Sequence, residues 1–560
     1  MIEMTGKQAL LEQLVAEGVR HVFGNPGTSE QPFMDLLQDY PQLQYVLALH
    51  EATAVGIADG YAWASGRPAF VQLHIAPGLG NAMGMLYNAR RTGTPLVVYA
   101  GQHEPTGVVQ EAILAADLVR MAEPLTKWAV EIHSAADIPT VLRRAFKVAA
   151  EPPRGPVFVS IPTNVMDQTA EMAIAPATRT HWRARPDPDA IQEAAAILTD
   201  ARRPVIVCGD GVATSGAIAE AVQLAEMLGA TVFSSFAMQL TFPFDHPLYH
   251  GLLNLIRPEG LRSQLAQADV VLILGSPAFP LLFALPESPF AAETKVIQMG
   301  LSSWELAKNW PTTLAMVADP LLGLRDLLAL LPQELSPAAR RAAETRLQAA
   351  REQRLGSDEA LESAVHSNRD AVPIVVPHLM KVLADLLSPD AIVYDESITA
   401  SAHLTRYLKL NRPGSYFRHA GGGLGSGLPG ALGVKLARPD SPVVGVVGDG
   451  AALYTIQALW TAARYRIPVT YVICNNASYR ILKLNMLQYL GEAAAGRRFV
   501  AMDLTDPLLD FARIAEAFGV RGQRVEHPDD LAPALRAALA AGEPALVDVV
   551  VEGTVGGIGL

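Results

Sequence analysis

Two apolar runs near the C-terminal end constrain the fold of this chain more strongly than any other part of the sequence. Val446–Gly450 reads Val-Val-Gly-Asp-Gly and Val472–Asn476 reads Val-Ile-Cys-Asn-Asn, so that Asn476 follows Asp449 by 27 positions. Each run ends in small or polar residues, which is typical of a buried parallel strand that runs into a loop, and the stretch 456–463 between them has helical character. A strand–helix–strand unit brings both strand ends to one edge of the sheet, where α/β proteins bind ligands. Asp449 and Asn476 would offer hard oxygen ligands there, suited to a Mg²⁺ ion that carries a diphosphate.

A second Gly-Asp-Gly triplet shows how little such a triplet means by itself. Cys208-Gly209-Asp210-Gly211 also follows an apolar run, Pro204–Val207. The corresponding distance beyond it holds Val232–Phe236 and no pair of asparagines. We therefore predict a plain strand-end turn at Asp210 and a ligand site only at Asp449.

Strand-like runs alternate with helix-like stretches along the whole chain, which predicts an α/β fold of parallel sheets flanked by helices. Two stretches interrupt the alternation: 175–189, rich in Pro, Arg and Thr, and the charged, Ala-rich 336–363, which has helical character. At 560 residues the chain is long enough for roughly three or four domains. We expect three domains, at residues 1–176, 190–335 and 365–560.

Composition and charge argue against several classes of protein. The net charge of −12 disfavours nucleic acid or an anionic membrane as a partner. The apolar runs are short and interrupted, well below the ~18 residues that indicate a membrane span, and the segment 1–7 lacks the basic and then apolar order of a signal peptide. The two cysteines, Cys208 and Cys474, lie in apolar runs and should be buried thiols in a reducing compartment. A cytoplasmic protein without membrane contact is the simplest expectation.

Glu51 is an unusual carboxylate in the N-terminal part of the chain. It follows the apolar run Leu47–Leu49 and precedes the Ala-rich stretch 52–62, which has helical character. An ordinary glutamate there would be a solvated first-turn residue that the helix dipole favours. Because this one closes an apolar run, we expect it to be buried, where a carboxylate without a partner is costly and tends to take up a proton. That property suits a carboxyl that shares a proton with a ligand.

Taken together, these features resemble the thiamine-diphosphate (ThDP) enzyme superfamily. The spacing of Gly-Asp-Gly and Asn-Asn is similar to its cofactor-binding motif. Further stretches are similar to benzoylformate decarboxylase and its relatives, in the same order along the chain: Phe23–Phe33, Leu73–Gly84, Asn411–Tyr416 and Gly422–Gly425. The resemblance covers essentially the whole chain. It implies, in chain order, a pyrimidine-binding domain, a central domain and a diphosphate-binding domain, with ThDP and Mg²⁺ as cofactors.

The resemblance also implies a role for each matching position. Glu51 would bind N1′ of the pyrimidine ring and help to ionise C2 of the thiazolium ring, and the Gly422 carbonyl would accept from the 4′-amino group. Leu424 would be the apolar wedge that bends the cofactor. The metal would be bound by Asp449, Asn476 and the backbone carbonyl of Ser478. The phosphates would meet backbone N–H groups at a helix start, which favours anions, in the stretch that holds Gly448, Gly450 and Ala451.

The implied reaction is the non-oxidative decarboxylation of a 2-oxo acid. The resulting enamine would be protonated and released as an aldehyde, or ligated to a second carbonyl compound such as an aldehyde acceptor. His74 matches the family's active-site histidine, and Thr28 stands where the family has a serine that contacts the substrate carboxylate. Leu282 falls, by an ungapped count, at the place of a second active-site histidine, and leucine cannot transfer a proton.

The expected substrate pocket differs from that of relatives that accept a phenyl ring. Ile481 and Asn485 fill positions where those relatives keep small and aromatic residues, and Arg418 stands where another pocket aromatic would be. Arg418, Arg480 and Lys483 are either solvated charges or, if they face the pocket, determinants of an anionic or polar substrate. The sequence therefore predicts poor use of benzoylformate.

Other functions stay open at this point. An acetolactate synthase-like carboligase is the closest rival, although its relatives usually lack a histidine at the position of His74, and an acyl-CoA lyase of the same superfamily is a further alternative. A non-catalytic subunit would lack Glu51 or the Asp449/Asn476 pair, and all three are present. The resemblance implies at least a homodimer, because the pyrimidine and diphosphate sites of one cofactor fall in different subunits, and relatives are commonly homotetramers.

Overall fold

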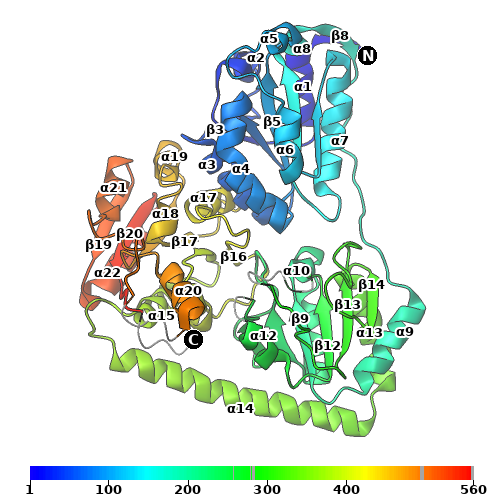
Figure 1. Ribbon diagram of the computed structural model, residues 1–560, viewed down its shortest axis with the longest axis vertical. Coiled ribbons are helices and arrows are strands. Elements are labelled where there is room, and N and C mark those ends of the chain that lie inside the picture. The colour runs from blue at the N-terminus through cyan, green and yellow to red at the C-terminus, as the bar shows by residue number, and fades with distance from the viewer. Residues whose placement is uncertain (256–257, 278, 280–283, 492–496, 556–560) are drawn as a thin grey trace.

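Three six-stranded sheets, each parallel throughout, organise the chain (Figure 1). The computed structural model describes residues 1–255, 258–277, 279, 284–491 and 497–555. Helices cover the sheets, so the predicted α/β fold of three parallel-sheet domains is confirmed; the exact domain boundaries stay predictions. No helix within the described residues is long and apolar enough to cross a membrane.

The first sheet has the strand order β3-β2-β4-β5-β7-β6. Neighbouring residues of its strands point to opposite faces, so that Val22 packs with α1 and α7 while Phe23 packs with α3 and α4. Its strands are β2 (His21–Gly24), β3 (Gln44–Leu47), β4 (Ala69–Leu73), β5 (Leu96–Gln102), β6 (Trp128–Glu131) and β7 (Val157–Pro162). Its helices are α1 (Gly6–Ala16), α2 (Gln31–Leu37), α3 (Glu51–Ser65), α4 (Ile75–Thr92), α5 (Pro105–Val109), α6 (Leu118–Ala122), α7 (Ile138–Ala150) and α8 (Thr163–Asp167).

The second sheet has the order β11-β10-β9-β12-β13-β14. From β9 the chain adds β10 and β11 on one side, and it then adds β12, β13 and β14 on the other side of β9. Its strands are β9 (Pro204–Cys208), β10 (Thr231–Ser234), β11 (Tyr249–Leu252), β12 (Val270–Leu274), β13 (Lys295–Gly300) and β14 (Leu314–Val317). Its helices are α9 (Pro188–Thr199), α10 (Asp210–Ser215), α11 (Ile218–Leu228), α12 (Pro258–Leu265) and α13 (Pro320–Glu334). The carboxylate of Asp210, where α10 begins, accepts from the N–H groups of Met238 and Gln239 and is thus used within the fold.

The third sheet has the order β16-β15-β17-β18-β20-β19. Its strands are β15 (Ile392–Glu396), β16 (Tyr416–Arg418), β17 (Val443–Gly448), β18 (Val469–Asn475), β19 (Arg521–Val525) and β20 (Ala545–Val550). Its helices are α15 (Val376–Leu386), α16 (Ser401–Tyr407), α17 (Gly427–Ala437), α18 (Asp449–Ala452), α19 (Ala458–Tyr465), α20 (Arg480–Leu490), α21 (Phe511–Ala517) and α22 (Pro528–Leu539).

One pair of strands departs from the expectation of parallel sheets throughout. β1 (Ile2–Thr5) pairs antiparallel with β8 (Thr169–Met172), outside the three large sheets. The pairing joins the two ends of the first domain, which lie far apart in the sequence. No local pattern could indicate it, because the pairing depends on where the folded domain brings its last segment.

Two helical features connect the domains. The stretch predicted to be helical near 336–363 is α14 (Pro337–Ser367), which runs along the lower edge of the molecule in Figure 1 from the second to the third domain.

The first and third domains pack through α3 and α17 at very close range. A Cβ atom on Gly60 would lie 2.1 Å from the carbonyl oxygen of Gly430, so this approach requires glycine.

Candidate active site

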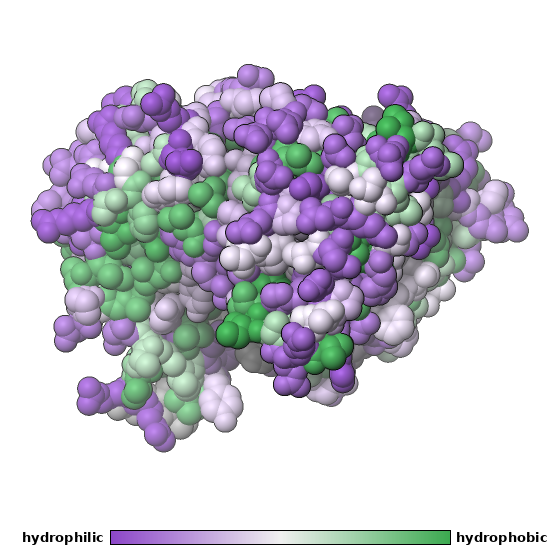
Figure 2. Space-filling view, turned by 90° about the horizontal axis from the view of Figure 1, so that it is seen from above, coloured by the Kyte–Doolittle hydropathy of each residue, from purple (hydrophilic) through white to green (hydrophobic). Residues whose placement is uncertain are grey.

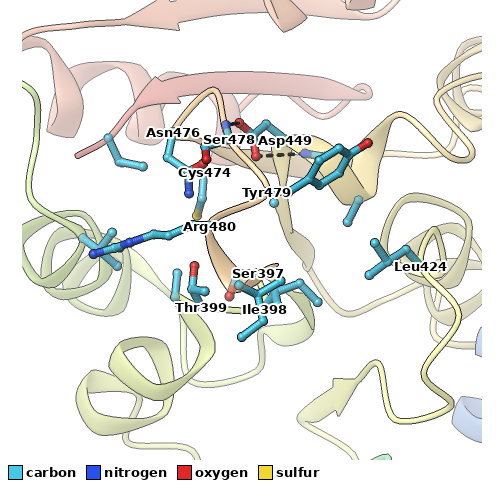
Figure 3. A pocket seen from close by; sticks show the side chains of 17 residues that line it. Ser397, Ile398, Thr399, Leu424, Asp449, Cys474, Asn476, Ser478, Tyr479 and Arg480 are labelled. Atoms are coloured by element: carbon cyan, nitrogen blue, oxygen red, sulfur yellow. Dashed lines mark hydrogen bonds between the residues drawn. The ribbon is translucent and has the colours of Figure 1, made fainter. Parts of the chain in front are cut away.

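The carboxyl edge of the third sheet carries a pocket (Figure 3). Strands β15, β17 and β18 end there side by side, because β17 pairs with both of the others. The loops that follow these strands line the pocket, together with the loop that precedes α17. Of the residues singled out from the sequence, the pocket collects Leu424, Gly448, Asp449, Gly450, Ala451, Asn476, Ser478, Arg480 and Ile481.

Asp449 is a buried carboxylate in this pocket. Its side chain accepts hydrogen bonds from the N–H of Gly450 at 2.8 Å and from the N–H of Ser478 at 3.3 Å (Figure 3). Burial raises the pKa of Asp449 to about 6, although these N–H groups work against the shift. A nearby cation would offset the cost of keeping the ionised carboxylate out of water.

The two adjacent asparagines have different surroundings. Asn475 is used within the fold, because its amide donates to Asp548 at 2.9 Å and accepts from the N–H of Ala477 at 3.2 Å. The Oδ1 atom of Asn476 is buried and has no hydrogen-bond partner in the described part of the chain. A buried acceptor without a donor costs free energy, which a bound cation would recover.

This donor set fits Mg²⁺. Asp449 and Asn476 offer one carboxylate and one free amide oxygen next to the backbone of Ser478, and hard oxygen atoms are the ligands that Mg²⁺ prefers. Within the described residues, no group of three or more His, Cys, Asp or Glu side chains is placed to hold a metal ion. The arrangement therefore favours an ion that a ligand such as a diphosphate helps to coordinate.

Three of the non-glycine residues with positive φ lie beside predicted site residues or line the pocket. Ala477 lies between Asn476 and Ser478 with φ of +48°, and Ile398, which lines the pocket, has φ of +53°. Ile75, directly after His74, has φ of +33°. Positive φ is rare for β-branched residues, and such strain clusters at functional sites, where the surrounding fold must hold it in place.

The loop before α17 holds Gly422 and Leu424, of which Leu424 lines the pocket and Gly422 does not, and Glu396 binds the C-terminal end of this loop. Glu396 is 1% exposed, and its two oxygens accept from the N–H groups of residues 425, 426 and 427 at 2.8, 3.2 and 2.6 Å. Burial raises the pKa of Glu396 to about 7, against the opposing effect of these N–H groups. Since Glu396 also ends β15, one side chain links two walls of the pocket.

A second group of predicted residues lies in the first domain. Glu51 begins α3 and is 5% exposed, as expected, but it is not without a partner, because Asn81 donates to its Oε2 atom at 3.0 Å. His74 precedes α4, and a Cβ atom on Gly78 would lie 2.9 Å from Oε1 of Glu51 and 3.1 Å from Cβ of His74. The two side chains therefore flank the same glycine.

Glu30 holds the imidazole of His74. Its Oε2 atom lies 2.9 Å from Nδ1 of His74, and its Oε1 atom accepts from Ser29 Oγ at 2.7 Å and from the N–H of Gly101 at 3.0 Å. This carboxylate favours the tautomer with the proton on Nδ1, which leaves Nε2 free for other partners. Thr28, two residues before Glu30, is exposed and accessible to a ligand.

The structure does not bring these two groups into one cavity. All lining residues of the pocket lie between positions 376 and 551, and Glu51, His74 and Thr28 are not among them.

The cations singled out from the sequence differ in their surroundings. Arg480 donates to the carbonyl of Thr554 at 3.0 Å, and its side chain extends away from Asp449 in Figure 3. Lys483 pairs with Asp503. Lys483 is therefore paired within the fold, whereas Arg480 lines the pocket and its buried Nε atom has no hydrogen-bond partner in the described residues.

Arg418 is a different case. It ends β16 and lies over the ring of Phe236 at 4.8 Å, and its Nε and Nη1 atoms are buried without a hydrogen-bond partner in the described residues. Neither Arg418 nor Asn485 lines the pocket. Leu282 lies outside the described residues.

Sequence reasoning did not single out Glu30, Asn81, Asn88, Glu396 or His419. Glu30 and Asn81 lie inside stretches that carry the family resemblance, which is the signal that could have drawn attention to them. Asn88, Glu396 and His419 belong to no sequence motif that would single them out. Their partners lie in other segments or at a turn that only the folded chain creates.

Comparisons with known proteins cover the chain almost completely. Three family descriptions match in order: "Thiamine pyrophosphate enzyme, N-terminal TPP binding domain" over residues 4–121, "central domain" over 191–327 and "C-terminal TPP binding domain" over 398–549. A benzoylformate decarboxylase of Pseudomonas aeruginosa is 36% identical over 550 residues, which cover 97% of this chain and 98% of that protein.

Other relatives carry different activities in their names. The acetolactate synthase isozyme 3 large subunit of Escherichia coli is 28% identical and covers 98% of this chain and 95% of its own length. Among solved structures, a ThDP-dependent 4-hydroxybenzoylformate decarboxylase of Rhodococcus jostii RHA1 superposes with a TM-score of 0.85 at 32% identity, over 99% of this chain and 100% of the other.

Proposed function

The chain belongs to the thiamine pyrophosphate enzyme family, and from this premise we propose that it decarboxylates a 2-oxo acid without oxidation and releases an aldehyde or ligates the product to an aldehyde acceptor. Membership makes it a ThDP-dependent carbon–carbon lyase or carboligase. The finer assignment follows the benzoylformate decarboxylases, to which the chain is similar over nearly its full length.

The observation that carries the decarboxylase assignment is the placement of His74 beside Glu51. Both flank Gly78, and Glu30 holds Nδ1 of His74 at 2.9 Å. With the proton on Nδ1, the free Nε2 atom can take up a proton close to the carboxyl of Glu51, and the imidazolium so formed can donate it. A decarboxylase that releases an aldehyde needs such a proton donor, because carbon must be protonated after CO₂ has left.

The proposed residues divide the work of binding and orientation. Bound ThDP supplies the electron sink that allows a 2-oxo acid to lose CO₂. Asp449, Asn476 and the Ser478 carbonyl would hold Mg²⁺, and Leu424 would support the bent cofactor from the pocket wall. Glu51 would hold a proton at N1′ of the pyrimidine ring, and Gly422 would accept from the 4′-amino group.

We propose a homodimer as the smallest active form. The pocket is lined by the third domain alone, so Glu51 and His74 would come from a second copy of the chain. Two large side chains are exposed, Tyr87 on α4 at 45% and Tyr454 after α18 at 55%. Figure 2 shows apolar side chains gathered on the left of a mostly hydrophilic face. A second copy would cover exposed apolar surface of this kind.

The substrate we favour is a small 2-oxo acid and not benzoylformate. Ile481 lines the pocket at a position where the phenyl-accepting relatives keep a small or aromatic residue, whereas Arg418 lies outside the pocket lining. Lys483 pairs with Asp503 and gives no support for an anionic substrate. Arg480 lines the pocket, and its buried Nε atom has no partner in the described residues, which supports a polar or anionic group on the substrate.

A carboligase similar to acetolactate synthase is the second candidate. Relatives with that name cover 98% of this chain. Leucine at position 282, in place of a proton-transferring histidine, favours ligation over release of an aldehyde.

Both candidates are tested with the purified protein, ThDP and Mg²⁺ on benzoylformate, pyruvate, 2-oxobutyrate and 2-oxoglutarate, with CO₂ and products followed with and without acetaldehyde. We expect CO₂ from the small aliphatic acids, and less from benzoylformate. Ligation of two pyruvate molecules without added aldehyde supports the carboligase. Absence of CO₂ from every acid, in a protein that binds ThDP, contradicts the decarboxylase proposal.

A further inference from the structure

The backbone around Gly422 is held by contacts from two directions. Asn88, on α4 of the first domain, accepts from the N–H of Gly423 through Oδ1 at 2.8 Å and donates to the carbonyl of Gly423 through Nδ2 at 2.7 Å. Asn88 is 5% exposed, so water competes little with these bonds. The side-chain amide of Asn88 thus bonds to both the backbone N–H and the backbone carbonyl of Gly423.

The bond from the N–H of Gly423 to Asn88 also sets the direction of the Gly422 carbonyl. The C=O of Gly422 and the N–H of Gly423 belong to one planar trans peptide unit, in which they point in opposite directions. Because the N–H points at Asn88, the carbonyl of Gly422 points away from α4. No donor among the described residues bonds to this carbonyl, so it is free to accept from a ligand.

His419 fixes the peptide on the other side of Gly422. Its Nε2 atom accepts from the N–H of Gly422 at 3.1 Å, and its Nδ1 atom lies 3.0 Å from Oγ of Ser426. Burial lowers the pKa of His419 to about 4, so the imidazole is neutral near pH 7. A neutral ring with its proton on Nδ1 can donate to Ser426 and accept from Gly422 at the same time.

We propose that Asn88 is a positioning residue that aims the Gly422 carbonyl at the 4′-amino group of ThDP, with His419 fixing the preceding peptide. The inference rests on the proposed role of Gly422. Gly422 has φ of +106°, a backbone conformation that glycine adopts freely, so side-chain contacts must select this orientation. Glu51 and Gly422 would hold the same ring, and a misdirected carbonyl should slow ionisation of C2 while the metal and diphosphate contacts remain.

The test measures the cofactor on the enzyme without substrate. The rate at which the C2 proton of bound ThDP exchanges for deuterium is followed by NMR after acid quench, and ThDP affinity is measured by calorimetry. In Asn88→Ala we expect exchange to slow about tenfold, the scale of one or two lost hydrogen bonds, while ThDP affinity changes by less than about threefold. Asn368→Ala removes an exposed amide far along the chain, at the end of α14, and should leave both quantities unchanged.

Asn88→Asp gives a sharper test. A protonated carboxyl presents the same acceptor and donor as the amide, whereas a carboxylate repels the Gly423 carbonyl. The exchange rate of this variant relative to wild type should therefore rise as pH falls from 8 to 6. The titratable groups nearest the loop, His419 and Glu396, are present in both proteins and cancel in the ratio.

The outcomes separate this inference from the function on which it rests. Wild-type exchange in Asn88→Ala would overturn the role of Asn88, and so would equal, pH-independent slowing in both variants. Failure of wild-type holoenzyme to accelerate exchange would instead contradict the proposed roles of Glu51 and Gly422. If Asn88→Ala does not fold, Asn88→Asp, which keeps the size of the side chain, decides the question alone.

Discussion

Oε2 of Glu30 lies 2.9 Å from Nδ1 of His74, and Glu30 is completely buried. The carboxylate fixes the ring and its tautomer, and three N–H groups, from Gly27, Ile75 and Gly101, hold the carboxylate in turn. The histidine that we place at the substrate is therefore oriented by a residue that need not touch the substrate.

Glu30→Gln should lower kcat at least about tenfold, because an amide no longer favours the proton on Nδ1 and acid–base help of this kind contributes a factor of about 10² or more. The pH profile of kcat should shift with it, which loss of packing alone does not cause. Glu193→Gln, the same change at an exposed position, is the matched control. An unchanged pH profile and kcat in Glu30→Gln would show that Glu30 does not act through His74.

Asp449→Ala should weaken ThDP binding at least about tenfold and abolish its dependence on Mg²⁺, because the remaining oxygen donors are too few for a hard cation. Calorimetry with and without Mg²⁺ measures both effects. The chain contains its own control, Asp210→Ala in the other Gly-Asp-Gly triplet, where the carboxylate bonds only to backbone N–H groups of the fold. That variant should lose stability and keep its ThDP affinity. Equal ThDP affinity in Asp449→Ala and wild type would rule out the metal assignment.

Glu51→Gln should keep ThDP bound and lower turnover at least about 10²-fold, since the amide preserves size but cannot share a proton with N1′. The steady-state rate at saturating ThDP is the measurement, with affinity checked by calorimetry. Asn81, which donates to Glu51 at 3.0 Å, can still bond to the glutamine carbonyl, so the local fold should persist. Near-normal turnover would mean that another residue activates the cofactor.

Stability of the ThDP-free protein should fall as pH rises from 5 to 8, in part through Glu396. Burial raises its pKa in the folded protein to about 7, above its value of 4.5 in an unfolded chain. The folded state therefore binds the extra proton between these values, and its stabilising effect is present at low pH and lost as pH rises through 7. The contribution is of the order of 1–3 kcal/mol.

Glu396→Gln tests this contribution, because the amide does not titrate. Thermal midpoints measured at pH 5, 6, 7 and 8 should depend less steeply on pH in the variant than in wild type, whatever the offset between the two proteins. Parallel pH curves would show that Glu396 is already ionised across this range.

Leu282→His should shift the products toward free aldehyde. Leucine cannot donate a proton, so in wild type the decarboxylated product should persist long enough to meet a second carbonyl compound. Chromatography of products from pyruvate or benzoylformate with acetaldehyde present measures the ratio of ligated to released product. Fast release of benzaldehyde by the wild-type protein, with no ligated product, would identify an ordinary benzoylformate decarboxylase.

Local patterns determined the architecture and one half of the candidate site. The alternation of apolar runs and helical stretches sufficed for three parallel-sheet domains, because hydrophobic periodicity is a property of short windows. Asp449 and Asn476 could be placed together from their spacing alone, since the strand–helix–strand unit between them has only one common hand and brings both strand ends to the same edge.

Tertiary structure decided what the other side chains do. Lys483 could not be distinguished from a substrate-binding cation until its partner Asp503 was known, and only the fold placed Arg480 in the pocket wall. Asn88 meets Gly423 across 335 positions, and the contact exists only because α3 and α17 pack closely enough to bring two domains together. Hydrophobic periodicity indicates which face of a single helix or strand is buried. The groups that orient a site come from helices and strands that meet only after the sheets have packed.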